Sequence, residues 1–334
     1  MTRVLVTGAG GYVGSHTCKA LSRSGFEPIG LDSLERAGMR ALPWAPLEIV
    51  DTSDSQGVAR VLEEYRPAAI LHFAAFAYVG ESVANPSLYY RNNVSGSISL
   101  LAAAQAAGIG SFVFSSSCAT YGIPQFVPIR EDHAQAPVNP YGSSKLMVER
   151  VLRDCDVAYG IRSVALRYFN AAGADPEIEI GECHDPETHA IPLAIRTAFG
   201  EQPAFEIFGT DYPTPDGTAI RDYVHVMDLA HAHVRALDYL LDGGQSTALN
   251  LGTGTGHSVR EVVKTVEAVT GRSVKTRPSP RRDGDPPVLV ADPERAGQVL
   301  KWKAEMTGLT DIVRTAVQWH RKWRSAQAVA ESQG

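Results

Sequence analysis

Cysteine is scarce in this sequence, and the few cysteines lie far apart. Only four of the 334 residues are cysteine, and no two of them form a Cys-x-x-Cys pair. A disulfide framework needs denser and closer cysteines, so the class of small disulfide-stabilised secreted proteins is excluded. A reducing cytoplasm is the simplest compartment for such a chain, and we expect a cytoplasmic protein. The four cysteines are Cys18, Cys118, Cys155 and Cys183.

Long hydrophobic runs and blocks of basic residues are also missing. No apolar stretch reaches the about 18 residues that suggest a membrane-spanning helix. The start of the chain lacks the basic segment and apolar core of a signal peptide. The formal net charge is −6, and apart from Arg281 and Arg282 the basic residues are scattered. We therefore expect neither a membrane nor a nucleic acid as a partner.

What the sequence does contain is a regular alternation of strand-like and helix-like segments over its first 170 residues. β-branched runs predict strands, and apolar residues at helical spacing between them predict helices, notably over 56–65 and 97–108. Apolar strands that alternate with helices predict an α/β fold with a parallel sheet covered on both faces. The predicted strands cover residues 3–8, 27–32, 47–51, 68–74, 111–117 and 163–170.

After residue 171 the alternation becomes less regular. Residues 173–189 are polar and predict a loop, and Ser258 and Glu261 have the spacing of a capping box that begins a helix. We expect one domain of residues 1–170, to which 222–255 return, and a smaller mixed α/β domain of residues 171–221 and 256–330. The other predicted elements are helices over 191–200 and 226–241 and strands over 204–209 and 248–252.

The segment VTGAGGYVGSH places Gly8, Gly11 and Gly14 between the first predicted strand and the first helix. Such glycines allow a tight turn and let backbone amides approach a pyrophosphate at the positive end of the helix. Asp32 ends the second strand, where a carboxylate accepts hydrogen bonds from the adenosine ribose and disfavours a 2′-phosphate. The pattern predicts a Rossmann-type doubly wound sheet that binds NAD. Asp51 ends the next strand and is either an adenine contact or a helix N-cap.

The segment NPYGSSK places Tyr141 and Lys145 one helical turn apart, directly after a proline that fits the start of a helix. A phenol is neutral near pH 7, but a nearby cation stabilises the phenolate and makes it a general base. The strand 111–117 ends in three serines, whose side chains we expect at the ligand crevice of the sheet. Ser, Tyr and Lys together are suited to oxidising or reducing a carbinol.

These motifs together resemble the UDP-glucose 4-epimerase (UDP-galactose 4-epimerase) family of the extended short-chain dehydrogenases/reductases. The match runs in order over about residues 2–303, through VTGAGGYVGSH, HFAAFAYVGES, YYRNNVSG, FSSSCATYG, NPYGSSKLMVE, LRYFNAAGA and RRDGDPP. The most specific part is GTDYPTPDGTAIRDYVHVMDLA, because it extends well beyond the Tyr-x-x-x-Lys pair.

The resemblance implies NAD-dependent interconversion of UDP-glucose and UDP-galactose through a transient 4-keto sugar, and it implies a homodimer. Tyr141 would take the proton of the sugar 4-hydroxyl, and Lys145 would hold the nicotinamide ribose and lower the pKa of Tyr141. Ser117 would bind the 4-oxygen, with Ser116 as the alternative. The expected cofactor-binding residues are Gly8, Gly11, Tyr12, Val13, Gly14, Asp32, Ser33, Asp51, Thr52, Phe73, Ala74, Ala75, Asn92, Ser115, Tyr141, Lys145 and Tyr168.

On the substrate side, the resemblance implies a diphosphate site and a uridine site, in addition to Ser117 and Tyr141. Arginine suits a diphosphate because its planar fork donates two parallel hydrogen bonds. The diphosphate residues would be Asn170, Arg221 and Arg282, with His189, which stands where an asparagine is frequent, also facing the diphosphate. Asp285 would hold the uridine ribose, and the backbone around Glu206 and Phe208 would read uracil.

Besides His189, three further positions depart from the family pattern. Ala77 stands where the family often has a lysine that contacts the cofactor, and Tyr78 is a partial substitute. Ala119 replaces a common threonine near the catalytic strand end. Leu289 stands where small residues accompany N-acetylhexosamines, and its intermediate size favours non-acetylated sugars.

Two further segments contain residues that could bind ligands. CHDPETH (183–189) has the residue types of a metal site, but its spacing fits no standard zinc pattern. We expect a loop that covers the substrate there, and no metal. GTGTG (252–256) lacks the lysine of a P-loop and predicts a strand-to-helix turn.

Three alternative functions remain open. UDP-arabinose/UDP-xylose 4-epimerisation would use the same chemistry. A nucleotide-sugar dehydratase needs an additional acid–base pair beside the catalytic strand, where this chain has Cys118, Ala119 and Thr120. An NAD-binding regulator commonly lacks the Tyr and Lys pair, which this chain retains.

Overall fold

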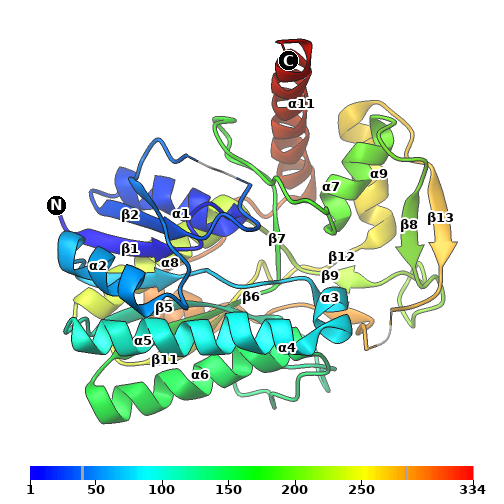
Figure 1. The fold of residues 1–334 in the computed structure, drawn as a ribbon. Helices are drawn as coiled ribbons and strands as arrows, with labels where there is room; N and C mark the ends of the chain where they lie inside the picture. The colour runs from blue at the N-terminus through cyan, green and yellow to red at the C-terminus, as the bar shows by residue number, and fades with distance from the viewer. Residues whose placement is uncertain (39–40, 283, 334) are drawn as a thin grey trace.

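The computed structural model describes residues 1–38, 41–282 and 284–333, and its largest element is a seven-stranded parallel sheet (Figure 1). The strand order changes direction between β1 and β4, which is where doubly wound sheets bind ligands. The confirmed fold class is therefore α/β with a Rossmann-type sheet. From edge to edge the strands are β11 (Thr247–Leu251), β6 (Arg162–Tyr168), β5 (Ser111–Ser117), β4 (Ala69–His72), β1 (Arg3–Thr7), β2 (Glu27–Asp32) and β3 (Leu47–Ile49).

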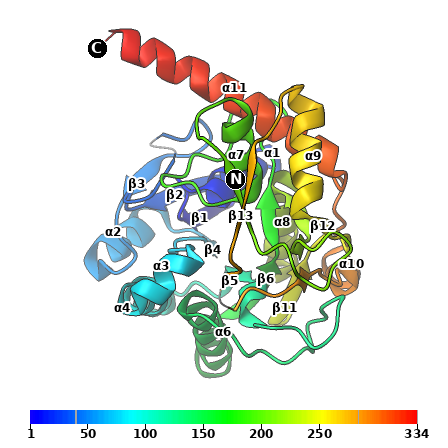
Figure 2. The same ribbon diagram turned by 90° about the vertical axis from the view of Figure 1, so that its right-hand side faces the viewer.

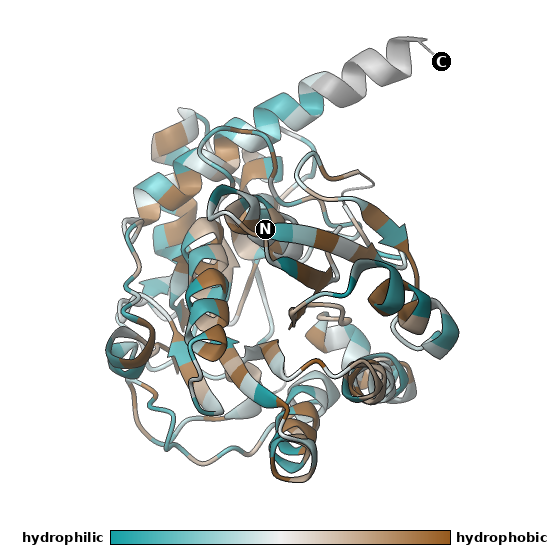
Figure 3. Ribbon diagram, turned by 90° about the vertical axis from the view of Figure 1, so that its left-hand side faces the viewer, coloured by the Kyte–Doolittle hydropathy of each residue, from teal (hydrophilic) through white to brown (hydrophobic). Residues whose placement is uncertain are grey.

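Helices cover both faces of the sheet, as the apolar strands predict (Figures 1 and 2). One face packs against α1 (Tyr12–Arg23), α8 (Val226–Leu241) and α10 (Glu294–Leu300). The other packs against α2 (Ser55–Tyr65), α5 (Gly96–Ala106) and α6 (Pro140–Tyr159). Figure 3 shows hydrophobic residues along the sheet strands, while the helices carry both hydrophobic and hydrophilic residues. This layering leaves the carboxyl ends of the strands for the site.

The second part of the chain has its own hydrophobic core between three helices and a short strand. The helices are α7 (Ala190–Ala198), α9 (Val259–Thr270) and α11 (Leu309–Gln333), and α11 extends away from the rest of the molecule (Figure 2). Strand β8 (Phe205–Phe208) pairs with β13 (Thr276–Ser279). A three-stranded sheet consists of β12 (His257–Ser258), β9 (Ile220–Arg221) and β14 (Val288–Leu289). This separate core supports the two-domain division, whose boundaries stay a prediction.

The remaining elements are short and lie around the strand ends. β7 (Asn170–Ala172) pairs with β10 (Tyr223–His225) outside the large sheet, so the strand predicted over 163–170 is in fact two. Between β4 and α5 lie α3 (Val79–Ala84), α4 (Pro86–Tyr89) and the π-helical turn η1 (Tyr90–Ser95), and the 3-10 turn η2 (Cys118–Thr120) follows β5. Within the described residues, the helices are all too short or too polar to span a membrane.

Most of the predicted elements are confirmed within one or two residues at each end. The predicted helix 226–241 is α8, and the capping box of Ser258 and Glu261 begins α9. The predicted strand 47–51 is shorter, since β3 ends at Ile49. The segment GTGTG is a turn built on Asp222, whose carboxylate accepts hydrogen bonds from the backbone N–H groups of Thr253 (2.8 Å) and Gly254 (3.1 Å).

A buried ion pair connects the two parts of the chain. The Lys19 ammonium on α1 is fully buried and lies 2.5 Å from the carboxylate of Asp175, which is also buried. Glu177 and Glu179 contact the same ammonium at 3.0 and 2.6 Å, but both are half-exposed. Asp175 lies in the loop 173–181, where an unpaired carboxylate would have no solvent to stabilise it. Its pairing with Lys19 therefore holds this loop to α1.

We expect Lys19→Met to lower the free energy of unfolding by about 3–5 kcal/mol, because it leaves the buried Asp175 carboxylate unpaired. The control is Arg130→Met, which breaks an exposed pair with Asp132 and should cost less than about 1 kcal/mol. Urea denaturation of both variants measures the difference. Equal stability of the two variants would contradict this role for Lys19.

Candidate functional site

The glycine turn after β1 forms one wall of a pocket at the carboxyl ends of the strands. Gly8 has φ +69°, and a side chain there would overlap the backbone of Ala74. A side chain on Gly14 would overlap the carbonyl oxygen of Gly8. The two glycines therefore allow the close approach of the turn, β4 and α1 that leaves backbone amides available to a pyrophosphate.

The pocket gathers many of the predicted cofactor residues. Asp32 accepts hydrogen bonds from the backbone N–H groups of Gly10 (2.9 Å) and Leu34 (2.8 Å), which fix its carboxylate at the end of β2. Burial raises the pKa of Asp32, and these two hydrogen bonds partly offset that effect. The predicted residues that line the pocket are Gly8, Gly11, Asp32, Ser33, Asp51, Thr52, Phe73, Ala74, Ala75 and Asn92.

The structure resolves the two interpretations of Asp51. Asp54 is the N-cap of α2, since its side chain accepts a hydrogen bond from the Gly57 N–H. Asp51 instead accepts hydrogen bonds from the backbone N–H and the hydroxyl of Ser53, and it lines the pocket. The helix-cap interpretation of Asp51 is therefore wrong, and the adenine-contact interpretation stays a prediction.

The pocket also contains residues that the sequence did not indicate. Arg36 lines it, lies 3.9 Å from the ring centroid of Phe76, and pairs with Glu81 at 2.6 Å. It lies in the irregular segment after β2, where no periodic pattern could reveal it. Arg36 therefore brings a cation to the lining of this pocket. The other unpredicted lining residues are Leu31, Ala37, Val50 and Phe76.

Tyr141, Lys145 and Ser117 meet where β5 ends and α6 begins. Asn139 caps α6 by accepting a hydrogen bond from the Gly142 N–H at 2.8 Å. The Lys145 ammonium donates to the Ser115 carbonyl oxygen at 2.7 Å and lies 5.9 Å from the Tyr141 ring centroid. Burial lowers the pKa of Lys145 to about 7. The predicted trio is therefore brought together.

The expected lowering of the Tyr141 pKa is wrong for the protein by itself. Burial raises the pKa of Tyr141 above its usual value, Tyr168 adds to this effect, and Ser117 partly offsets it. The main cause is the burial of the phenol, because a buried site disfavours the charged phenolate.

The three serines at the end of β5 have different partners, because side chains alternate along a strand. Ser115 bonds to the Tyr168 hydroxyl, and Ser117 lies beside Tyr141. Ser116 points to the opposite face and donates to Glu149 at 2.5 Å. Ser116 is therefore excluded as the alternative to Ser117.

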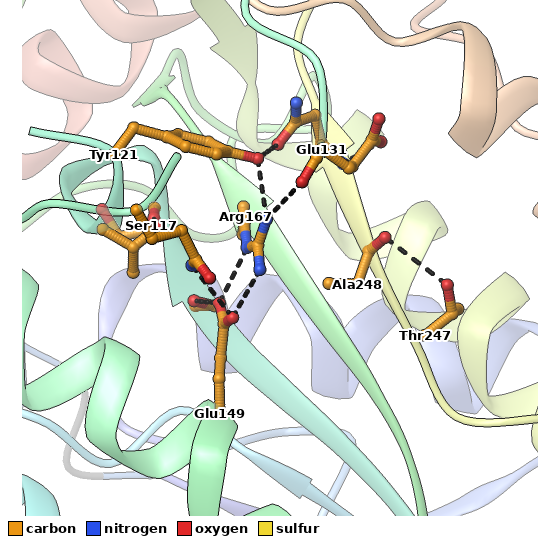
Figure 4. Close-up of polar contacts among 11 residues, drawn as sticks. Ser117, Tyr121, Glu131, Glu149, Arg167, Thr247 and Ala248 are labelled. Carbon is orange, nitrogen blue, oxygen red and sulfur yellow. Dashed lines mark hydrogen bonds and ion pairs between the residues drawn. The ribbon is translucent and has the colours of Figure 1, made fainter. Parts of the chain in front are cut away.

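A buried polar network lies behind the trio (Figure 4). Arg167 on β6 donates to both carboxylate oxygens of Glu149 on α6, at 2.9 and 2.6 Å. It also donates to the Tyr121 hydroxyl at 2.8 Å, which in turn donates to the Asn250 side chain at 2.7 Å. The network joins β6, α6 and β11 and thereby fixes α6 against β5. Glu149 lies one turn beyond Lys145, so its spacing could have identified it.

The predicted substrate residues form a second group, near the small sheets. Arg221 forms an ion pair with Asp285, and the Arg282 guanidinium lies 4.0 Å from the Phe208 ring centroid. The backbone N–H of Asn170 donates to the Asp222 carbonyl oxygen at 3.0 Å, which places Asn170 beside Arg221 in space.

The other predicted residues lie outside the pocket lining. Tyr12 donates to the Gly173 carbonyl oxygen at 2.6 Å, so it connects the glycine turn to the second part of the chain. Glu206 pairs with Arg277 on the outer side of β8. His189 bonds to Glu182 rather than to a site residue. Val13 and Gly14 lie in the first turn of α1.

Comparison with known proteins gives the same picture. Residues 4–252 match the NAD dependent epimerase/dehydratase family. The chain belongs to this family. A relative from Rhizobium leguminosarum bv. trifolii, named UDP-glucose 4-epimerase, is 53% identical over 96% of this chain and 97% of its own length.

Solved structures of family members share the fold. The UDP-glucose 4-epimerase of Brucella ovis in complex with NAD has a TM-score of 0.93 and 50% identity, covering 95% of this chain and 98% of its own. The enzyme of Stenotrophomonas maltophila, solved with NAD and formylated UDP-arabinopyranose, has a TM-score of 0.92 and 40% identity, covering 98% and 100%.

We expect Gly14→Ala to lower the free energy of unfolding by about 1–3 kcal/mol and to abolish retention of NAD, because its methyl group overlaps the Gly8 carbonyl. Gly80→Ala is the control, since a methyl group there meets open space on α3 and should be neutral or stabilise by up to about 1 kcal/mol. Thermal unfolding and the NAD content of the purified variants measure both effects. NAD retention by the Gly14 variant would contradict the role of the turn.

Proposed function

We propose that the protein interconverts UDP-glucose and UDP-galactose by epimerisation at C4, with NAD as a tightly bound cofactor. The observation that carries the proposal is the meeting of Tyr141, Lys145 and Ser117 at the carboxyl end of β5, on the sheet edge that also carries the pocket. In a doubly wound sheet this edge is where a dinucleotide and its substrate meet. The proposed activity would serve galactose metabolism.

In the proposed mechanism Tyr141 removes the proton of the 4-hydroxyl, and Ser117 holds the 4-oxygen. When bound, NAD⁺ would serve as both the acceptor and the donor of the hydride at C4. Because burial raises the pKa of Tyr141, its deprotonation requires positive charge nearby, which Lys145 provides in its charged form. The Lys145 ammonium, anchored to the Ser115 carbonyl, also holds the nicotinamide ribose.

For the substrate, Asn170, Arg221 and Arg282 bind the diphosphate, while Asp285 holds the uridine ribose. The ion pair of Arg221 with Asp285 supports these assignments. It puts the residue assigned to the diphosphate beside the residue assigned to the ribose, and these two groups are neighbours in a nucleotide. Uracil then lies against the backbone at Glu206 and Phe208 on β8. His189 faces the diphosphate through the ring nitrogen that does not contact Glu182.

We expect Tyr141→Phe to lower the turnover of UDP-galactose to UDP-glucose by about 10²–10⁴-fold while NAD stays bound, because only the proton-accepting oxygen is lost. Tyr159→Phe at the exposed end of α6 is the matched control and should keep wild-type turnover. The same assay with UDP-arabinose and UDP-xylose tests the pentose alternative. A Tyr141 variant with full turnover would remove the proposed base.

We also propose that the protein is a cytoplasmic homodimer that pairs through α5 and α6. These helices lie side by side at the outside of the molecule (Figure 1), and each exposes a large apolar side chain. Ile98 on α5 is 46% exposed and Met147 on α6 is 42% exposed. Exposed apolar residues on neighbouring helices are suited to a four-helix interface with a second copy.

A double variant, Ile98→Glu with Met147→Glu, should be a monomer in size-exclusion chromatography with light scattering, because it places charges in the proposed interface. Ile49→Glu is the control, since Ile49 is 68% exposed on the edge strand β3, away from these helices. It should remain a dimer. A monomeric wild type, or a dimeric double variant, would refute the interface.

A further inference from the structure

The loop between β7 and α7 brings together four side chains with metal-ligand chemistry. Glu182, His184, Glu187 and His189 each contribute one ligand atom, and all four atoms lie within 4.8 Å of one another. The two histidines approach the same atom: Oε1 of Glu182 lies 2.9 Å from Nδ1 of His184 and also contacts Nδ1 of His189. We call these four residues the 182–189 cluster.

The spacing within CHDPETH (183–189) fits no standard zinc pattern. The fold, however, brings a different set of side chains together. Cys183, which belongs to that segment, is not among the residues whose ligand atoms cluster. Glu182, which directly precedes the segment, is at the centre of the cluster. The ligand pattern is Glu-x-His-x-x-Glu-x-His, and two imidazoles with two carboxylates are ligands that Zn²⁺ accepts in tetrahedral geometry.

Two carboxylates of the 182–189 cluster are largely buried. The Glu182 side chain is 6% exposed, and Glu187 is buried as well. Two buried carboxylates side by side are costly unless cations or hydrogen bonds compensate them. Glu187 Oε1 accepts only backbone hydrogen bonds, from Thr188 at 2.7 Å and His189 at 2.8 Å. One divalent cation would compensate both charges.

A second cluster in the described residues shows the contrast. Asp175, Glu177 and Glu179 also bring carboxylate atoms within 4.8 Å of one another. Their charges are already compensated, since the Lys19 ammonium lies among all three and Arg23 pairs with Glu177. The 182–189 cluster contains no lysine or arginine, and its only nitrogen donors are two imidazoles, which are themselves metal ligands.

We propose that the 182–189 cluster binds one Zn²⁺ ion, which fixes the loop between the two parts of the chain. The His184 ring lies edge-on to Tyr12 of the glycine turn and to Tyr78, with ring centroids 6.1 Å apart in each case. On the other side, Trp319 of α11 donates to the Glu182 carbonyl oxygen at 3.0 Å. An ion at the cluster would therefore hold together elements from both parts.

The test is direct metal binding by the full chain without an affinity tag, so it is independent of turnover. The protein is stripped with dipicolinate, and Zn²⁺ is added in an isothermal titration. We expect one Zn²⁺ per chain. Loss of a residue that only hydrogen-bonds to a metal ligand lowers metal affinity by about 10–100-fold. Because His184 and Glu187 would be ligands themselves, His184→Ala and Glu187→Gln should each weaken Zn²⁺ binding by at least about 100-fold.

The matched control is His320→Ala, which removes a histidine paired with a single glutamate, Glu201, at 2.8 Å. It should bind Zn²⁺ like the wild type. Co²⁺ added to the wild type should give the visible absorption of a tetrahedral site. Glu187→Gln should abolish this absorption, so the test remains possible even if His184→Ala does not fold. No stoichiometric binding by the wild type, or equal binding by Glu187→Gln and His320→Ala, would overturn the proposal.

Discussion

The site depends on the buried ion pair between Arg167 and Glu149. Its two parallel hydrogen bonds tie β6 to α6 (Figure 4). Ser116 brings β5 into the same contact by donating to Glu149. Loss of one partner of such a pair leaves an uncompensated buried charge, so the geometry is held strongly. Because Glu149 follows Tyr141 and Lys145 on one face of α6, the pair fixes the reacting face of that helix against the strand that ends in Ser117.

The same principle of compensated burial recurs across the molecule. Lys19 with Asp175 joins α1 to the second part of the chain, and Asp222 accepts the backbone hydrogen bonds that shape the turn after β11. Each of these buried charges has a partner from a distant segment. The parallel sheet supplies the common edge, and these contacts set the angles at which loops and helices meet there.

Much of the fold could be predicted from the sequence, because its signals are local. The apolar strands, the glycine turn and the capping box of α9 are patterns within a few residues of one another, and the structure confirms them. What could not be predicted depends on tertiary contacts. Arg36 enters the cofactor pocket from an irregular loop, and Asp51 lines that pocket instead of capping α2. The Tyr141 pKa depends on burial, which spacing does not report.

The central claim is that hydride leaves C4 of the sugar for the bound cofactor and returns to the same carbon. The most direct test is conversion of UDP-galactose that carries deuterium at C4. The account predicts UDP-glucose that retains the deuterium at C4, since the hydride never exchanges with water. Product that has lost the label to solvent would contradict the account.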